Sequence, residues 1–362
     1  MSALTFDTSL GTLTTTVVGR LAGSIKGRNG TRPTMVDVAR HARVSLKTVS
    51  RVVNGEPGVS TGTTERVRSS IEALSFRRHE GASHLRRGST TASLGIVLGD
   101  VANPFYSAMT RAVEEVAFRH GSLVVAGSSD EDVVRERQLA LALCARRVDG
   151  LLVVPAGNDH SYLNAELIAG TPVVFVDRPG VGIQADAVLV DNAGGARAAV
   201  AHLATYGHAR IAFLGDNSAI YTARERLRGY RQGLAALGSA RDARLVAMGP
   251  HTLQSVSEVL GRLRMEHQPP TALITGNNRI TVLVLRVLAK MRSWRPALVG
   301  FDDLELADLL SPALTVVEQD ASQLGRTAAE LLFSRLAGDR RPIQRVVLPT
   351  RLVPRGSGEL KP

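Results

Sequence analysis

Residues 34–54 constrain the fold of this chain more than any other stretch. Thr34 followed three residues later by Asp37 is a carboxylate version of the capping box, which predicts the start of a helix. Ser45 predicts the start of a second helix, because a serine hydroxyl can accept a hydrogen bond from a backbone amide of the first helical turn. Between the two helices there is room only for a tight turn at Arg43.

The second predicted helix is amphipathic, because Val49, Val52 and Val53 recur at helical spacing. This spacing turns outward a polar and basic face that comprises Leu46, Lys47, Ser50 and Arg51. Two helices joined by a tight turn, the second with such a face, form a helix-turn-helix, whose second helix lies in the DNA major groove. The alternative is two short helices that only pack within a small helical domain.

The charge distribution favours DNA binding. Residues 1–90 carry 14 Lys and Arg against 6 Asp and Glu, whereas residues 91–362 carry 30 against 27. A basic end on a nearly neutral body is typical of a protein with a polyanionic partner, because each neutralised phosphate releases counterions.

Residues 34–54 resemble the LacI/GalR family of bacterial transcription regulators. Its members carry the pattern Thr-x-x-Asp-Val-Ala-x-x-Ala-Gly-Val-Ser-x-x-Thr-Val-Ser-Arg-Val-x-Asn, and the chain matches nearly every specified position. The departure is Arg43, which stands where the family usually has glycine. If its backbone is left-handed, this residue costs roughly 1–2 kcal/mol.

The resemblance implies which side chains read DNA. Leu46, Lys47 and Arg51 match positions that touch base edges, where Lys and Arg can pair with guanine and Leu suits the thymine methyl group. For each of these residues the alternative is a solvated helix position. The other implied DNA contacts, mostly to phosphates, are Thr34, Ser45, Thr48, Ser50 and Asn54.

A third helix is predicted from a cap at Ser60 to about Ser75. The segment that follows it is basic and nearly free of apolar residues, so its composition alone predicts a plain linker. The resemblance implies instead a hinge that becomes helical on operator DNA. In that hinge Ala82 and Leu85 would contact DNA, with Leu85 as a wedge in the minor groove.

From Ser93 onward, short apolar runs alternate with helical stretches. Apolar strands separated by helices predict parallel sheets buried on both faces, and about 270 residues fit two such sheets better than one. The predicted strands are Leu94–Leu98, Leu123–Ala126, Gly150–Pro155, Val173–Val176, Ile211–Leu214, Thr271–Thr275 and Ala297–Phe301.

Polar residues follow most of these runs, at the strand ends where open parallel sheets bind ligands. They are Asp100, Ser128, Ser129, Asp177, Arg178, Asp216, Asn277, Asn278, Asp302 and Asp303. The sequence therefore predicts a polar ligand cleft at the carboxyl ends of the strands.

The resemblance extends over residues 33–356 and implies an α/β fold similar to that of periplasmic sugar-binding proteins. Two Rossmann-like subdomains with parallel sheets would follow the small all-α domain, joined by crossovers near Asp191, Gln319 and Ile343. The expected parts are a disordered extension (1–32) or an over-assigned start, the helix-turn-helix domain (33–76), the hinge (77–92), an effector-binding and dimerisation domain (93–356) and a tail (357–362). Within the effector domain we expect an N-subdomain (about 93–191 and 319–343) and a C-subdomain (about 192–318 and 344–356).

The resemblance also implies ligand contacts. Arg226 is the foremost, because a guanidinium group binds vicinal hydroxyls or a carboxylate through two hydrogen bonds. Ile220 stands where purine-responsive members have Arg, which favours a sugar or sugar derivative over a purine. The alternative for Asp302 is that it caps a turn or a helix start, the role also expected of Asp191 and Asp303. The full set is Pro104, Phe105, Asp177, Thr222, Arg226, His251, Asn278 and Asp302.

Catalysis finds little support in the sequence. The nine histidines include no His-x-x-x-His pair, one cysteine cannot build a thiolate metal site, and no phosphate-binding loop is present. Cys144 is expected to be a buried, reduced thiol, which agrees with a cytoplasmic protein. No metal or cofactor is expected beyond the small-molecule effector.

An exported sugar-binding protein is the alternative, but it would need a signal peptide and has no use for residues 34–90. No apolar run approaches the length of a membrane span. The sequence thus predicts a cytoplasmic homodimeric repressor that binds a pseudo-palindromic double-stranded operator, with no membrane association. Induction by the effector is preferred over corepression on family frequency.

Overall fold

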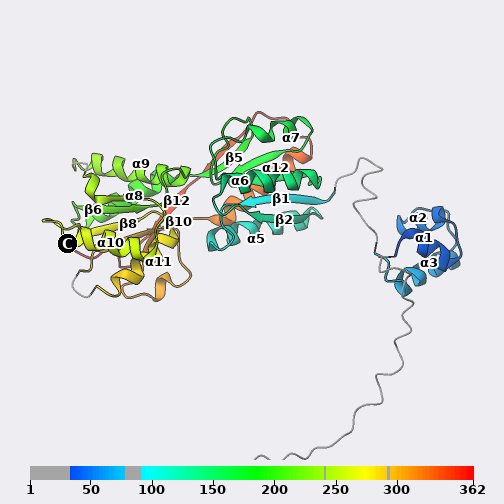
Figure 1. The fold of residues 1–362 in the computed structure, drawn as a ribbon, viewed down its shortest axis with the longest axis horizontal. Coiled ribbons are helices and arrows are strands. Elements are labelled where there is room, and N and C mark those ends of the chain that lie inside the picture. The colour runs from blue at the N-terminus through cyan, green and yellow to red at the C-terminus, as the bar shows by residue number, and fades with distance from the viewer. Residues whose placement is uncertain (1–32, 78–90, 240–241, 292–293) are drawn as a thin grey trace, which may run out of the picture. The chain divides into compact units, whose positions relative to one another are not determined.

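The computed structural model describes residues 33–77, 91–239, 242–291 and 294–362. The chain divides into two compact units, residues 1–89 and residues 90–362 (Figure 1). Ala82 and Leu85, and the whole of the predicted extension, lie outside the described residues.

The smaller unit contains three helices, α1 (Met35–Ala42), α2 (Leu46–Val53) and α3 (Thr61–Ala73). Val38, Val49 and Val67 are fully buried where the three helices meet, and Ile71 and Leu74 pack against them. This apolar cluster is the small three-helix core that the sequence predicts.

The predicted N-terminal caps of α1 and α2, at Thr34 and Ser45, are both present. The Asp37 carboxylate accepts hydrogen bonds from the Thr34 amide at 2.9 Å and from the Thr34 hydroxyl at 2.7 Å. The Ser45 hydroxyl accepts a hydrogen bond from the Thr48 amide at 3.1 Å. Ser60 is the N-cap residue of α3, as predicted, but its hydroxyl donates to the Thr63 hydroxyl at 3.0 Å and accepts no hydrogen bond from a first-turn amide in the described structure.

The turn between α1 and α2 is left-handed at Arg43, with φ 53° and ψ 48°. The Val44 amide then donates to the Ala39 carbonyl at 3.0 Å, which closes the turn. An L-residue in this conformation costs roughly 1–2 kcal/mol, so the departure from glycine carries the strain that the sequence predicts.

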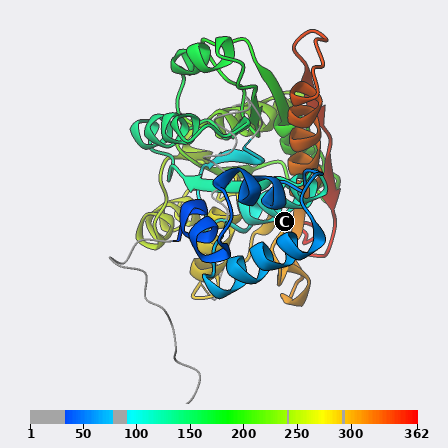
Figure 2. The same ribbon diagram turned by 90° about the vertical axis from the view of Figure 1, so that its right-hand side faces the viewer.

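The larger unit contains two lobes, each with a sheet covered by helices on both faces (Figures 1 and 2). In the first lobe the strand order is β11-β5-β4-β3-β1-β2, and all pairs are parallel. The strands are β1 (Ser93–Leu98), β2 (Leu123–Ser128), β3 (Gly150–Val153), β4 (Val173–Val176), β5 (Asp186–Val190) and β11 (Arg345–Leu348).

One face of this sheet is covered by α5 (Pro104–Arg119) and α12 (Ala321–Leu336), whose apolar residues share a core with β1, β3 and β4. The other face carries α6 (Val133–Ala145), the 3-10 turn η1 (Ser161–Leu163) and α7 (Asn164–Ile168). Continuous burial of β3 and β4 follows from this coverage.

In the second lobe the strand order is β12-β10-β9-β8-β6-β7, and only β12 runs antiparallel to its neighbour among the described pairs. The strands are β6 (Ile211–Gly215), β7 (Val246–Met248), β8 (Ala272–Thr275), β9 (Ala297–Phe301), β10 (Thr315–Gln319) and β12 (Thr350–Val353). One face packs against α8 (Asn192–Thr205) and α9 (Tyr221–Ala236), the other against α10 (Leu253–Arg264) and α11 (Asn278–Leu288). Short 3-10 turns lie at η2 (Ala243–Leu245) and η3 (Ala307–Leu309).

The chain crosses between the sheets after β5 and after β10, at Asp191 and Asp320. These two crossings lie where they were expected. The third lies at Pro349, later than the position expected near Ile343, because β11 still pairs with β5 in the first lobe. Strand β11 contains only three apolar residues in succession and its exposure alternates, so its pattern is not that of a buried parallel strand.

Residues 357–362 are not a separate tail. Ser357 is buried and its hydroxyl accepts from the Thr315 amide at 2.8 Å and donates to the Leu298 carbonyl at 2.6 Å. Glu359 accepts a hydrogen bond from the Thr315 hydroxyl at 2.8 Å. These contacts fasten the segment to the second lobe, so the expected boundary after residue 356 is wrong.

Candidate functional site

Helix α2 carries the predicted DNA-reading face. Leu46 is half exposed and Lys47 is exposed, while Arg51 and Ser50 are partly exposed on the same helix. Within the described residues neither Lys47 nor Arg51 forms a hydrogen bond or ion pair, so both cations are available to a partner.

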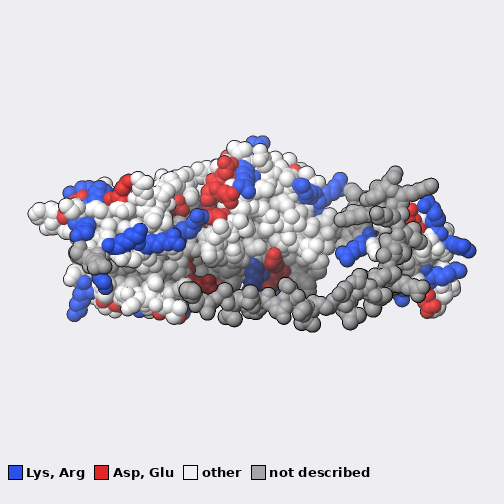
Figure 3. All heavy atoms as spheres, turned by 60° about the horizontal axis from the view of Figure 1, so that its bottom comes forward, with Lys and Arg blue, Asp and Glu red and all other residues white. Residues whose placement is uncertain are grey.

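On the face shown in Figure 3, basic and acidic side chains are interspersed over the larger unit.

The predicted phosphate-contacting residues are held by local hydrogen bonds. The Ser45 and Thr48 hydroxyls lie 2.8 Å apart, and the Asn54 amide donates to the Ser50 hydroxyl at 3.3 Å. Thr34 is the N-cap residue of α1 in the same unit. These contacts place short polar groups at the two ends of α2, where a helix beside a DNA backbone needs donors.

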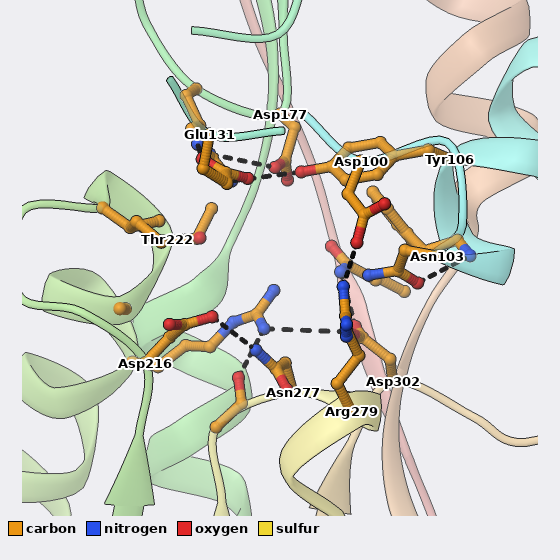
Figure 4. Close-up of a pocket in the computed structure, with 17 residues that line it drawn as sticks. Asp100, Asn103, Tyr106, Glu131, Asp177, Asp216, Thr222, Asn277, Arg279 and Asp302 are labelled. Carbon is orange, nitrogen blue, oxygen red and sulfur yellow. Dashed lines mark hydrogen bonds and ion pairs between the residues drawn. The ribbon is translucent and has the colours of Figure 1, made fainter. Parts of the chain in front are cut away.

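The larger unit holds a polar cavity of about 90 Å³ between its two lobes. Most of its lining residues lie just after the carboxyl ends of strands or at the first turns of the helices that follow, as predicted. They are Asp100, Asn103, Phe105, Tyr106, Glu131, Asp177, Arg178, Asp216, Ile220, Thr222, Ala223, Arg226, Gly276, Asn277, Arg279, Asp302 and Gln319. Figure 4 shows side chains of the first lobe, such as Glu131 and Asp177, facing those of the second, such as Asp216 and Thr222.

Five of the predicted ligand contacts line this cavity: Phe105, Asp177, Thr222, Arg226 and Asp302. The other three do not. Pro104 occupies the first turn of α5, His251 lies with its Nε2 atom 3.0 Å from the Gly215 carbonyl, and Asn278 bonds to the other lobe.

Arg226 is buried and bridges several elements. Its Nε atom donates to the Asn192 side chain at 2.7 Å and its Nη1 atom to the Gly276 carbonyl at 2.6 Å. The guanidinium lies 3.8 Å from the centre of the Phe301 ring and 3.7 Å from the Asp302 carboxylate. Its Nη2 atom has no partner among the described residues, which leaves one donor for a ligand.

Arg178 organises the opposite wall. It donates two hydrogen bonds to the Glu131 carboxylate, at 2.5 and 2.7 Å, and further bonds to the Pro155 carbonyl and the Tyr106 hydroxyl. Glu131, Tyr106 and Arg279 carried no signal that identified them from the sequence, because their place depends on partners far along the chain.

Asp177 and Asp302 occupy equivalent places, directly after β4 and β9, with φ of 68° and 67°. The backbone amide of each donates a hydrogen bond to the neighbouring strand: Asp177 to the Val188 carbonyl of β5, and Asp302 to the Val317 carbonyl of β10. Left-handed non-glycine residues are costly and cluster at functional sites. Burial raises the pKa of the Asp177 carboxyl, whose Oδ1 atom is buried and has no partner in the described structure.

Two contacts join the lobes directly across this cleft. The Asn278 side-chain amide donates to the Asn103 carbonyl oxygen at 2.8 Å. Arg279 forms an ion pair with Asp100. Because each contact has one partner in each lobe, the pair resists separation of the lobes.

Several residues serve the fold instead of the cleft. Asp191 caps α8 by accepting from the Gly194 amide at 2.8 Å, and Asp303 pairs with Arg355 at 2.6 Å. His208 is buried, with its ring nitrogens hydrogen-bonded to the Thr271 hydroxyl and the Leu360 carbonyl. Cys144 is buried and free, and burial raises the pKa of its thiol to about 11.

Within the described ranges, no group of three or more His, Cys, Asp or Glu side chains could hold a metal ion. Nor is any described helix both long and apolar enough to cross a membrane.

A helix-turn-helix unit joined to a two-lobed unit with a polar cleft defines a class of protein, the ligand-responsive DNA-binding regulators. Residues 34–79 match the bacterial regulatory proteins of the lacI family, and residues 200–358 match the periplasmic binding protein-like domain. The chain belongs to the lacI family and is a DNA-binding transcriptional regulator. The resemblance and the fold class predicted from the sequence are confirmed.

Similar proteins cover nearly the whole chain. The HTH-type transcriptional regulator GalR of Escherichia coli (strain K12) is 34% identical over 321 residues, which are 86% of this chain and 91% of GalR. CelR of Thermobifida fusca is 33% identical and covers 90% of this chain and 98% of its own.

Solved structures of similar fold include regulators of the same kind. The lac repressor dimer bound to operator and the anti-inducer ONPF has a TM-score of 0.78 at 26% identity, covering 91% of this chain and 100% of that one. The complex of the regulator CelR with cellobiose has a TM-score of 0.65 at 32% identity, covering 90% of this chain and 100% of that one.

Proposed function

We propose that this protein is a repressor that binds a pseudo-palindromic operator as a homodimer and is controlled by a sugar or sugar derivative in the cleft. The observation that carries the proposal is the presence, in one chain, of α2 with its unpaired cations and a polar cleft crossed by contacts between two lobes. Ligand binding in the cleft would be the input of a switch, and DNA binding by α2 would be its output.

Operator reading would fall to Leu46, Lys47 and Arg51, whose side chains project from α2. Arginine and lysine bind the O6 and N7 atoms of guanine, and leucine suits a thymine methyl group. Thr34, Ser45, Thr48, Ser50 and Asn54 would fix the unit on the phosphates. Ala82 and Leu85 would add the hinge contacts that the family resemblance implies.

A sugar fits the cleft because its hydroxyls both donate and accept hydrogen bonds. The cavity offers acceptors at Asp177 and Asp216 and a donor at Arg226, while the Phe105 ring can lie against a sugar face. The structure of the similar regulator CelR contains cellobiose. We also propose that the cleft binds its ligand without converting it, needs no cofactor, and works in the cytoplasm, where operator DNA lies.

Exposed apolar side chains on the larger unit support a homodimer. On the first lobe Phe118 and Leu123 are 82% and 74% exposed, near the edge strand β2. On the second lobe Leu306 and Leu309 are 62% and 75% exposed. Exposed apolar patches mark interaction sites, and a second copy of the chain is the occupant we propose.

The effector would act by linkage. A ligand shifts operator affinity only as far as its affinities for the DNA-competent and the incompetent dimers differ. Selection of operator sites from random duplex DNA, followed by titration of sugars against the complex, tests the proposal. We expect an inverted repeat to be selected and one sugar to change its affinity; enrichment of no repeat would overturn the DNA-binding role we assign to α2.

A further inference from the structure

The cleft contains more carboxylates than cations. Five carboxylates line it, those of Asp100, Glu131, Asp177, Asp216 and Asp302, and three guanidinium groups, those of Arg178, Arg226 and Arg279. Neither Lys nor His is among its described lining residues. With every group ionised, the lining carries two negative charges in excess.

Every arginine of the cleft already has an acidic partner. Arg178 binds both oxygens of Glu131, and Arg279 pairs with Asp100. Arg226 donates two hydrogen bonds to uncharged groups, and its Nη1 atom lies 3.7 Å from the Asp302 carboxylate. An anion that entered the cleft would therefore have to displace a carboxylate from its cation, or use a donor that has no described hydrogen bond, such as Nη2 of Arg226, beside the Asp302 carboxylate.

The two carboxylates in excess are those of Asp177 and Asp216. The side chain of Asp177 is 5% exposed, its Oδ1 atom has no described partner, and its Oδ2 atom lies 3.5 Å from the Nε atom of Arg178. Asp216 accepts from the Asn277 side-chain amide at 2.8 Å and from the Asn217 backbone amide at 2.7 Å, but from no cation in the described structure. Both can accept hydrogen bonds from a ligand.

The partial positive charges at helix N-termini compensate only part of the excess negative charge of the cleft. The first turns of α5 and α11 are capped by the side chains of Asn103 and Asn277, which accept from backbone amides at 3.1 and 2.8 Å. The first turn of α9 has no described side-chain cap, and Thr222 and Ala223 of this turn line the cavity. A helix terminus is worth about half a positive charge, less than the excess of two.

We propose that the effector carries no negative charge: it is a neutral polyol, and an ammonium group in place of a hydroxyl is tolerated or favoured, whereas a phosphate or carboxylate is rejected. This inference rests on the proposed function of the cleft and narrows its ligand class. The reason is electrostatic, since an anion taken out of water beside uncompensated carboxylates loses hydration and gains repulsion.

Matched ligand sets test the proposal on the full-length protein at pH 6.5. Each set comprises a neutral sugar (galactose, glucose or ribose), its amino sugar where one exists, the sugar acid and the sugar phosphate, with binding measured by titration calorimetry and thermal shift. In the set that binds, we expect the acid and phosphate to bind at least about tenfold more weakly than the neutral sugar, a difference of about 1.4 kcal/mol.

Tightest binding by an acid or phosphate would overturn the inference and leave the proposed sugar-responsive function intact. Failure of all sugars to bind, with operator binding retained, would instead overturn the sugar part of the proposed function and the inference with it. The two failures are therefore distinguishable.

Variants test the cause of the selectivity. Asp216→Asn removes one excess charge with little change of shape, and we expect the ratio of neutral to anionic affinity to fall several-fold. Glu258→Gln is the matched control, because Glu258 is exposed on α10 outside the cavity and its loss changes the net charge equally. An equal ratio in the two variants would overturn the electrostatic basis.

Discussion

The contact between Asn278 and Asn103 should set how readily the lobes close. Asn278 is 4% exposed and donates to Asn103 across the cleft at 2.8 Å, yet it does not line the cavity. Its replacement by alanine therefore removes an interaction between the lobes without removing a ligand contact. Because the Oδ1 atom of Asn278 is buried without a described partner, the substitution also relieves a desolvation cost.

A neutral hydrogen bond contributes about 0.5–1.5 kcal/mol net. The Asn278→Ala substitution should thus shift the ratio of closed to open lobes by a factor of about 2–12, since about 1.4 kcal/mol is tenfold. An effector that binds the closed form would lose affinity by up to the same factor, while the free energy of unfolding should change little.

The assay is a double-mutant cycle of Asn278→Ala, Asn103→Ala and the double variant. Effector affinity is measured by calorimetry, and the radius of gyration of the ligand-free full-length protein by X-ray scattering. The cycle is needed because Asn103 also caps α5. Arg286→Ala, an exposed site on α11, is the control. A coupling energy within about 0.3 kcal/mol of zero would refute the reasoning.

Three further predictions concern single residues. Arg43→Gly should raise the free energy of unfolding of the smaller unit by about 1 kcal/mol in urea titration, because glycine removes the left-handed strain but loses some backbone entropy; no gain would mean that the turn is unstrained. Asp177→Asn should stabilise the ligand-free protein near pH 7 but not near pH 4, because a carboxyl whose folded pKa is raised contributes most when protonated and loses that contribution as the pH rises; an equal effect at both pH values would contradict this. Cys144 should stay unreactive towards a thiol reagent at pH 8 until the protein unfolds, because burial raises the pKa of its thiol to about 11; rapid labelling of the native protein would contradict it.

Local signals predicted much of the fold. The caps at Thr34 and Ser45 depend only on residues three positions apart, and strands such as β3 and β4 are buried on both faces and so read as apolar runs. Strands β5, β7, β10, β11 and β12 were not among the predicted strands. β7, β11 and β12 form sheet edges and contain partly or fully exposed residues, so they lack the burial that produces long apolar runs. β5 and β10 lie inside the sheets and are almost fully buried, so exposure does not explain why they were missed.

The positions of polar residues after the strands predicted the cleft as a whole better than they predicted each residue that lines it. Asp100, Asp216 and Asn277 were found from their place after strands, because carboxyl ends of parallel strands share one edge. Asn278 was assigned to the ligand, but one residue along a helix is a rotation of about 100°, which turns Asn278 to the other lobe. Glu131 was missed because its role arises only once Arg178 lies beside it.

Operator selection combined with sugar titration decides whether this protein reads an operator through α2 under the control of a sugar. Full-length protein is incubated with random duplex DNA, bound sequences are determined, and the affinity of the best sequence is measured with and without each neutral sugar. We expect an inverted repeat to be enriched, and one neutral sugar to change the affinity of the protein for this repeat at least about tenfold. We expect the Arg51→Ala variant not to enrich the repeat. Enrichment of no inverted repeat, or the same repeat from the Arg51→Ala variant, would contradict operator reading through α2.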